Sequence, residues 1–307
     1  MRDNSLIFVA GLPRSGSTLL LNLLGQNPAH HVTPTSGLIE LFVLTQTNWP
    51  NFVEFKAEGL ERVKPRVRDA MRGMLHGYFA SELAAGKTVF DKSRGWLQYV
   101  EPLEEVLQRN VRIIVPVRDI RAIIASFEKL YRKRSIDFRM PVGEAYFQAQ
   151  TIEGRAHALL APGGIVGLAI NRLRDALMRG VGDRLLIVPY PALSGFPEAT
   201  LDILHDALGL PSFAYDPLNV EQVTEENDAF HGMDLHRVRR KVSPPESIPW
   251  EGILPQELCE FLAEQFADIH RLSNPSPFER SSSATGDCDS AINLLSSRSN
   301  SRRMSVL

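Results

Sequence analysis

The sequence predicts an α/β fold in which a mostly parallel sheet is covered by helices on both faces. Four short apolar runs have the composition of buried strands, and they alternate with longer stretches in which apolar residues recur at helical spacing. Parallel strands need crossover connections, which are usually helices, so this alternation indicates a parallel sheet. With 307 residues, of which 44% are hydrophobic, the chain can bury the core of one large domain.

The overall composition limits the partners and the compartment. A net charge of −2 argues against nucleic-acid binding by bulk charge, so any basic patch must be local. Cys259 and Cys288 form neither a disulfide framework nor a metal-binding spacing, which favours a reducing compartment. No apolar run reaches the roughly 18 residues that a membrane span needs. Because the N-terminus also leads directly into a strand, we expect a cytoplasmic protein without a membrane span.

The first predicted strand is the apolar run of residues 6–10, and a Leu-rich helix follows after a turn. The turn contains Gly11 and Gly16, which let the backbone approach a ligand closely. Backbone N–H groups at the start of a helix, with the helix dipole behind them, favour a phosphate or a similar anion. The turn differs from the nucleoside-triphosphate loop G-x-x-x-x-G-K-[ST], because Ser17 stands in the lysine position and the cation inside the loop is Arg14.

The turn resembles the loop that binds the 5'-phosphosulfate in sulfotransferases that use 3'-phosphoadenosine 5'-phosphosulfate (PAPS). Its Pro-Arg-Ser-Gly form is nearer to the tyrosylprotein sulfotransferases and their bacterial relatives than to the cytosolic small-phenol enzymes. The resemblance implies a P-loop-like sulfotransferase fold, PAPS as the cosubstrate and no metal. It also implies a catalytic role for the loop arginine at the transferring group. The residues that it assigns to cofactor binding are Pro13, Arg14, Ser15, Gly16, Ser17 and Thr18.

A polar loop is expected over residues 30–37, with a helix beginning after Ser36, a suitable N-cap. Glu40 then lies one turn into this helix and could face the cleft beside the phosphosulfate loop. Tyrosylprotein sulfotransferases carry a glutamate pair shortly after their first helix, and Glu40 is the first carboxylate met here. We therefore predict that Glu40 is the catalytic base that takes the acceptor proton. The alternative bases are His30, His31 and Asp91.

A long helix with several basic residues is expected from about residue 60 to 85, and a second buried strand follows over residues 88–91. The basic helix face is either a solvated surface or a surface that attracts an acidic acceptor. Lys92 and Arg94 come directly after the strand, at the edge where open α/β sheets bind ligands. In sulfotransferases of this type a lysine follows the corresponding strand and reaches the transferring sulfate, which implies a catalytic role for Lys92.

The strongest strand signal, residues 111–117, ends in Arg118 and continues as a helix that contains Ser126. The resemblance assigns this arginine and serine to the 3'-phosphate of PAPS. The chemistry suits the assignment, since a guanidinium offers two parallel donors to a phosphate and the hydroxyl adds a further bond. A competing interpretation makes Asp119 the magnesium ligand of a kinase, but the missing loop lysine removes its main support.

Two further helices are expected at about residues 144–160 and 164–180, before a fourth buried strand over residues 184–190. This strand resembles the late strand of the sulfotransferase family that ends in Tyr-Glu. Because Pro191 stands in the glutamate position, only Tyr190 is carried over as a cofactor-site candidate.

The predicted domain ends with a basic loop over residues 231–243 and a helix from about 255 to 269. Beyond Leu272 the chain is Ser-rich and has too few large apolar groups to offset the entropy of ordering. We therefore expect a sulfotransferase domain over residues 1–272 and a disordered tail over residues 273–307. In relatives a late loop with basic residues and a serine closes over the nucleotide, which indicates Arg239, Lys241 and Ser243.

The motifs together predict sulfuryl transfer from PAPS to an acceptor hydroxyl. The resemblance to tyrosylprotein enzymes and the basic segments at residues 62–72 and 129–139 favour peptidyl tyrosine in an acidic peptide or protein. A sugar or a small-molecule hydroxyl is the alternative acceptor. A small-molecule kinase and a non-catalytic nucleotide-binding module are the alternative functions. The oligomeric state stays open, with a homodimer among the options.

Overall fold

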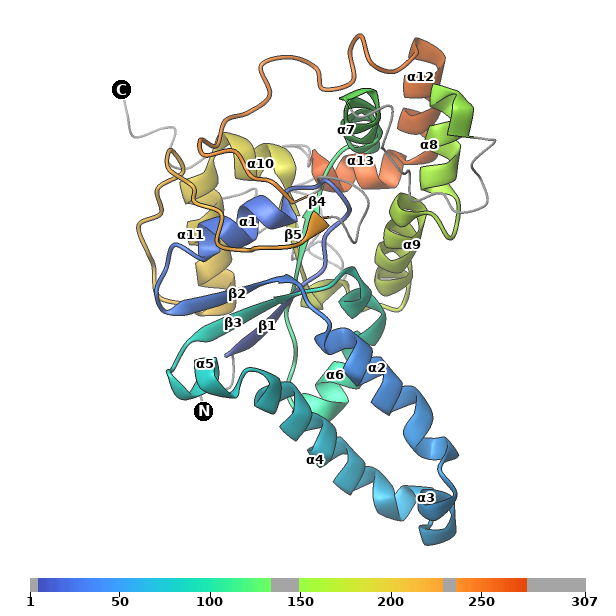
Figure 1. Ribbon diagram of the computed structural model, residues 1–307, viewed down its shortest axis with the longest axis vertical. Coiled ribbons are helices and arrows are strands. Elements are labelled where there is room, and N and C mark those ends of the chain that lie inside the picture. The colour runs from blue at the N-terminus through green and yellow to red at the C-terminus, as the bar shows by residue number, and fades with distance from the viewer. Residues whose placement is uncertain (1–4, 134–148, 229–235, 275–307) are drawn as a thin grey trace, which may run out of the picture.

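A computed structural model of the chain describes residues 5–133, 149–228 and 236–274, with a five-stranded sheet at its centre (Figure 1). The strand order is β2-β3-β1-β4-β5, and every neighbouring pair is parallel, so the predicted α/β class is confirmed. The strands are β1 (Leu6–Val9), β2 (His30–Thr35), β3 (Thr88–Lys92), β4 (Ile113–Val117) and β5 (Leu185–Pro189).

Alternation of side chains along the strands divides the core into two clusters. In β1, Leu6 and Phe8 belong to the larger cluster, while Ile7 and Val9 belong to the smaller one on the other face. Every residue of β1, β4 and β5 is buried, as expected for parallel strands that are covered on both faces. The sheet is therefore the middle of three layers.

Helices cover both faces of this sheet, and an arm formed by α2, α3 and α4 extends away from it (Figure 1). The helices of the larger cluster are α2 (Leu38–Asn48), α4 (Leu60–Tyr78), α5 (Ala80–Ala84), α6 (Val100–Leu107), α7 (Ile120–Lys133), α8 (Ile152–Leu160), α9 (Ile165–Met178), α12 (Gln256–Gln265) and α13 (Ala267–Ser273), with the 3-10 helix η2 (Arg94–Tyr99). Those of the smaller cluster are α1 (Ser17–Leu24), α10 (Tyr190–Gly195) and α11 (Pro197–Leu208). The remaining short helices are η1 (Trp49–Asn51), α3 (Val53–Glu58) and η4 (Gly182–Arg184).

Residues 30–35 form a strand where a polar loop was predicted, so that prediction was wrong. β2 pairs with β3 through residues 30–32, and its register shifts before Thr35. As the edge strand of the sheet, β2 has one unpaired side and tolerates both polar residues and Pro34. The apolar run on which the other strand predictions depended is absent here.

Two predicted helices are each divided into two. The expected helix over residues 60–85 is α4 and α5, which are separated at Phe79, and the last expected helix is α12 and α13, separated at Phe266. Helix α13 ends at Ser273, one residue beyond the expected domain end. Residues 144–148 of an expected helix and residues 275–307 of the expected tail lie outside the described residues.

Among the described residues, the stretch Ile152–Met178 has the length and apolar composition that would allow a membrane span. It forms two helices, α8 and α9, with a break between them at residues 161–164. Leu159, Ile170 and Leu173 from this stretch belong to the larger core cluster. Its apolar side chains therefore contribute to packing within the domain.

Candidate active site

A cavity of about 530 Å³ opens at the edge where the five strands end. All five strands contribute to its lining through a residue at or just after the strand end: Gly11, Thr35, Lys92, Arg118 and Tyr190. Open parallel sheets bind ligands at this edge, so the position agrees with a ligand site. Most of the predicted site residues line the cavity: Pro13, Arg14, Gly16, Ser17, Thr18, Lys92, Arg118, Ser126, Tyr190, Arg239, Lys241 and Ser243.

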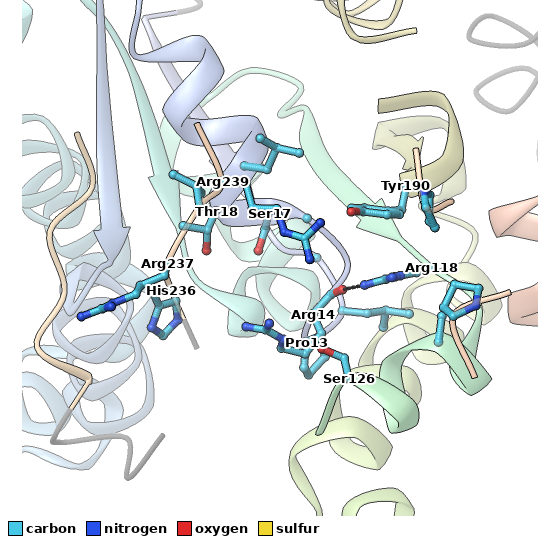
Figure 2. A pocket seen from close by; sticks show the side chains of 18 of the residues that line it. Pro13, Arg14, Ser17, Thr18, Arg118, Ser126, Tyr190, His236, Arg237 and Arg239 are labelled. Atoms are coloured by element: carbon cyan, nitrogen blue, oxygen red, sulfur yellow. Dashed lines mark hydrogen bonds between the residues drawn. The ribbon is translucent and has the colours of Figure 1, made fainter. Parts of the chain in front are cut away.

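The side chains converge on one space from several directions (Figure 2). Ser17 and Thr18 extend toward it from the start of α1, whereas Arg14 lies across the space from them. Arg118 and Tyr190 lie together on another side. Segments that are far apart in the sequence therefore share one cavity.

Unusual backbone conformations shape the turn between β1 and α1, residues 11–16, which is called the phosphosulfate loop after its resemblance. Arg14 has φ 58° and Gly16 has φ 93°, both in the left-handed region that residues other than glycine seldom adopt. Between them, Ser15 is buried, and its hydroxyl donates to the carbonyl oxygen of Leu12 at 2.6 Å. The Ser15 side chain thus holds the turn from inside and does not line the cavity. Helix α1 begins without a side-chain cap, so its first N–H groups can bind an anion.

Tyr190 packs directly on this loop, which explains the need for glycine at position 16. A Cβ atom on Gly16 would lie 2.8 Å from Cδ2 of Tyr190, in addition to the strain of its positive φ. The guanidinium of Arg118 lies over the Tyr190 ring in a cation–π contact, with Cζ 4.2 Å from the ring centroid. Tyr190 therefore forms part of the cavity wall between the two motifs.

Hydrogen bonds join the two predicted phosphate motifs. Nε of Arg14 donates to Oγ of Ser126 at 3.0 Å, and Nη1 of Arg118 donates to the carbonyl oxygen of Arg14 at 3.1 Å. Burial lowers the pKa of both guanidinium groups, and the charge of Arg118 lowers the pKa of Arg14 further. Two desolvated cations at close range favour an anionic ligand, because the ligand charge offsets both burial and repulsion.

Lys92 is buried at the end of β3 and forms an ion pair with Glu226, with 3.5 Å between Nζ and Oε2. Burial lowers the pKa of Lys92, while the carboxylate of Glu226 opposes this effect. Burial would raise the pKa of Glu226, but Lys92 and hydrogen bonding from Thr35 outweigh it and hold that pKa at about 2. Glu226 is therefore ionised at neutral pH and fixes the Lys92 ammonium at the cavity.

His236, which the sequence analysis did not single out, also lines the cavity. Its Nδ1 lies 2.6 Å from Oδ1 of Asp228, and its Nε2 lies 3.5 Å from Oε2 of Glu226. Burial and then the charge of Lys92 lower the pKa of His236, against the opposing effects of the two carboxylates. A neutral imidazole that donates from Nδ1 to Asp228 keeps the lone pair on Nε2, which is the arrangement of a general base.

A buried asparagine on α1 fastens the segment that leads to Glu226. Oδ1 of Asn22 accepts the N–H groups of Val223 and Thr224 at 2.5 and 3.0 Å. Nδ2 of Asn22 donates to Oγ1 of Thr224 at 2.8 Å. These bonds link the helix after the phosphosulfate loop to the acidic residues beside Lys92.

The late basic loop lines the cavity from residue 236 onward, and residues 231–235 lie outside the described residues. The N–H of Val220 donates to the carbonyl oxygen of Arg240 at 2.6 Å, and the N–H of Val242 donates to that of Pro217 at 2.8 Å. These bonds hold the loop against the preceding segment, so that its predicted side chains reach the cavity: Arg239, Lys241 and Ser243.

Glu40, the predicted base, is exposed on the first turn of α2 and does not line the cavity. Leu38, Ile39 and Phe42 turn toward the core, which directs Glu40 outward. Its charge instead acts on Arg172 of α9.

The alternative bases named from the sequence also lie outside the cavity lining. His30 is buried, with Nδ1 3.1 Å from the carbonyl oxygen of Leu24. Asp91 is buried and accepts a hydrogen bond from Nε1 of Trp96 at 2.8 Å, and burial raises its pKa to about 6. His31 packs near the ring of Phe79.

The carboxylate of Asp119, the proposed magnesium ligand of the kinase interpretation, makes contacts within the fold. Its oxygens accept from Nε and Nη2 of Arg121 at 3.0 and 2.6 Å, and Oδ2 lies 2.9 Å from Nδ1 of His270. Within the described part of the chain, no group of three or more His, Cys, Asp or Glu side chains is placed to hold a metal ion. The kinase interpretation therefore gains no support from this residue.

The basic face of α4 is largely neutralised by neighbouring carboxylates. The ion pairs are Lys64 with Glu105, Arg66 with Glu58, and Arg72 with Asp69. In the second basic segment, Arg132 bonds Glu128, and residues 134–139 lie outside the described residues.

Comparisons with known proteins concern the fold and the family of the chain. The sulfotransferase domain from the curacin biosynthetic pathway superposes with a TM-score of 0.53 at 18% identity, covering 85% of this chain and 96% of that one. The sulfotransferase domain from the Synechococcus PCC 7002 olefin synthase gives 0.49 at 21% identity, covering 85% and 94%. The comparison with curated proteins finds no match. A model of the sulfotransferase family matches residues 6–215, more than half of the chain, and the protein therefore belongs to the sulfotransferase family.

Proposed function

We propose that the protein transfers the sulfuryl group of PAPS to an acceptor hydroxyl. The observation that carries this proposal is the contact between two motifs assigned to opposite ends of PAPS. Arg14 of the phosphosulfate loop bonds Ser126, and Arg118 bonds the loop backbone. Two adjoining cationic sites in one cavity suit a donor with phosphate groups at its 5' and 3' positions. The volume of about 530 Å³ also lies within the range of small-molecule sites, about 300 to 1,000 Å³.

In the proposed reaction, the acceptor oxygen attacks the sulfur in line with the oxygen that bridges sulfur and phosphorus. The new oxygen–sulfur bond forms as the bridging bond breaks with its electron pair, and adenosine 3',5'-bisphosphate leaves. Arg14 and the first N–H groups of α1 stabilise the 5'-phosphosulfate, and Lys92 stabilises charge on the transferring group and the leaving oxygen. Arg118 and Ser126 bind the 3'-phosphate.

We propose that Nε2 of His236 takes the proton from the acceptor hydroxyl. The lowered pKa keeps this imidazole neutral at pH 7, and Asp228 orients the ring and stabilises the imidazolium that forms. Glu226 has a pKa of about 2 and is too weakly basic for this step. Its charge serves to hold Lys92 and to favour the protonated His236 after transfer.

For the acceptor, the proposal retains the tyrosine of an acidic peptide as one substrate class. Exposed basic side chains at the cavity, Arg237, Arg239 and Lys241, would attract a negatively charged acceptor. The paired side chains of α4 contribute little to such attraction. A sugar or small-molecule hydroxyl is the alternative class.

The proposed donor is tested by incubating the protein with radiolabelled PAPS and separate pools of acidic tyrosine peptides, sugars and phenols. We expect label in at least one pool, and we expect adenosine 3',5'-bisphosphate to raise the Tm more than ATP with magnesium does. Stronger protection by ATP would favour a kinase. Binding of PAPS without transfer to any pool or to host lysate would favour a nucleotide-binding module.

The base is tested with His236→Gln, which removes the basic nitrogen and keeps a polar side chain. We expect kcat to fall by about 10²- to 10⁴-fold while the affinity for PAPS changes little. In the wild type, activity should fall as the pH drops through the pKa of His236, which burial and the charge of Lys92 lower from the ordinary value of a histidine. Glu40→Gln is the matched control and should stay active. An active His236→Gln enzyme beside an inactive Glu40→Gln enzyme would return the role to Glu40.

A further inference from the structure

Two neighbouring arginines, of which Arg94 lines the Lys92 end of the cavity, lack the carboxylate partners that nearby arginines have. Arg94 begins η2, two residues after Lys92, and lines the cavity without a hydrogen bond or ion pair in the described part of the chain. Arg172 comes from α9, which packs on η2 behind Arg94 and outside the cavity lining, and its buried Nε has no partner among the described residues. Elsewhere on α9, by contrast, Arg174 bonds Asp268 through both carboxylate oxygens.

Charges around the two arginines leave an excess of positive charge. Burial and then the charge of Arg172 lower the pKa of Arg94, and Glu226 only partly opposes them because it is shared with Lys92. Glu40 acts on Arg172 from a distance and forms no ion pair within the described residues. Buried like charges are costly unless an anion neutralises them, so this arrangement suits a negatively charged ligand.

The sheet order separates this pair from the proposed nucleotide site. In the order β2-β3-β1-β4-β5, Arg118 follows β4, on one side of β1, and Arg94 follows β3, on the other. The phosphosulfate loop follows β1 in the middle. The nucleotide groups therefore lie on the β4 side and the transferring sulfur near β1, which leaves the β3 side for the acceptor.

We infer that Arg94, with the charge of Arg172 behind it, binds a carboxylate of the acceptor, on the same molecule as the hydroxyl that receives the sulfuryl group. The planar guanidinium groups offer paired donors that match the two oxygens of a carboxylate. This inference rests on the proposed function. It narrows the acceptor to a hydroxyl compound that carries a carboxylate, supplied either by a free hydroxy acid or by an acidic residue beside a tyrosine.

The test compares acceptors that differ only in this charge. The pairs are para-hydroxyphenylacetate and its amide, beta-hydroxybutyrate and its amide, and a tyrosine peptide flanked by glutamates and the same peptide flanked by glutamines. Initial rates with radiolabelled PAPS give kcat/KM for each member. Calorimetry with enzyme saturated with adenosine 3',5'-bisphosphate gives acceptor affinity without any turnover.

We expect the acid in at least one pair to exceed its neutral counterpart by about tenfold or more in affinity and kcat/KM. Arg94→Gln should remove that preference, Arg172→Gln should reduce it, and both should leave the affinity for adenosine 3',5'-bisphosphate unchanged. Arg174→Gln, the same substitution on the same helix, should retain the preference. The pair that shows the preference identifies the source, a free acid or a peptide.

Three results would overturn the inference. One is the absence of preferential binding of any acid, and another is a preference that survives both substitutions. The third is a loss of affinity for PAPS but not for adenosine 3',5'-bisphosphate in Arg94→Gln, which would place Arg94 on the sulfuryl group. Equal transfer to acids and amides would end this inference and leave the proposed function intact. A wild-type protein that does not bind PAPS would end the proposed function itself.

Discussion

Replacing Arg118 with alanine tests whether the cavity recognises a 3'-phosphate. Arg118 is held by its bond to the carbonyl oxygen of Arg14 at 3.1 Å and by the ring of Tyr190 at 4.2 Å. Its pKa is lowered by burial, so its charge is largely desolvated. Removing one partner of such a contact costs about 2 to 5 kcal/mol. We therefore expect Arg118→Ala to weaken binding of adenosine 3',5'-bisphosphate by about 30-fold to several thousand-fold.

The measurement must separate the 3'-phosphate from the general shape of the loop, because Arg118 also supports the backbone at Arg14. Calorimetric titration of wild type and Arg118→Ala with adenosine 3',5'-bisphosphate and with adenosine 5'-monophosphate completes a thermodynamic cycle. Disturbance of the loop would weaken binding of both ligands. Loss of a contact with the 3'-phosphate would weaken binding of adenosine 3',5'-bisphosphate only. Arg118→Lys keeps the charge but loses the guanidinium fork, and its affinity should be intermediate.

Equal weakening of the two ligands would mean that Arg118 only supports the loop. A wild-type protein that binds both nucleotides equally would refute the reasoning more completely, because no group in the cavity would then recognise the 3'-phosphate. Either result would remove the main support for PAPS as the donor.

Three further predictions concern catalysis and stability. Arg14→Ala should lower kcat by about 10²-fold, and an unchanged kcat with a raised KM for PAPS would show that the residue only binds. Glu128→Gln should lower the free energy of unfolding by about 3 to 5 kcal/mol in denaturant titrations, because Glu128 bonds the buried guanidinium of Arg155 at 2.8 and 2.9 Å; a loss below 1 kcal/mol would contradict this. Burial lowers the pKa of His30 to about 4, so between pH 6.5 and 4 this histidine is protonated mainly in the unfolded chain. The free energy of unfolding should therefore fall as the pH drops through this range. The pKa of Asp91 is raised to about 6, so its protonation has the opposite effect on stability in this range. The measured quantity is therefore the difference in the free energy of unfolding between wild type and His30→Gln as a function of pH. Parallel curves for the two proteins would refute the assignment to His30.

The local sequence pattern determined those motifs that lie within one short stretch of the chain. The apolar strand, the glycine turn and the following helix specify the phosphosulfate loop, because turn conformation and helix start depend on adjacent residues. The strand ending in Arg118 and the helix containing Ser126 are likewise adjacent in sequence. Parallel strands then bring Arg14, Arg118 and Lys92 to one edge, so most of the cavity lining followed from the element order.

The direction of individual side chains required the tertiary structure. Ser15 lies inside the predicted motif but turns inward to bond Leu12, and Glu40 turns outward because its helix buries Leu38 and Ile39. Neither outcome is visible in residue type, since a serine in a turn and a glutamate on a first helical turn fit either direction.

Local sequence pattern also did not predict the pairing of the edge strand β2 or the hydrogen bonds between segments that are far apart in the sequence. β2 forms because the open edge of β3 supplies hydrogen-bond partners, although its own composition is that of a loop. Glu226 lies beside both Lys92 and His236, and Asn22 of α1 holds the segment just before Glu226 through bonds that span most of the sequence. The sequence by itself therefore determined the fold class and the conformation of the proposed anion-binding loop, which depend on neighbouring residues. The tertiary structure alone decided the proposed base and the approach of Arg172 to Arg94, which depend on contacts between distant residues.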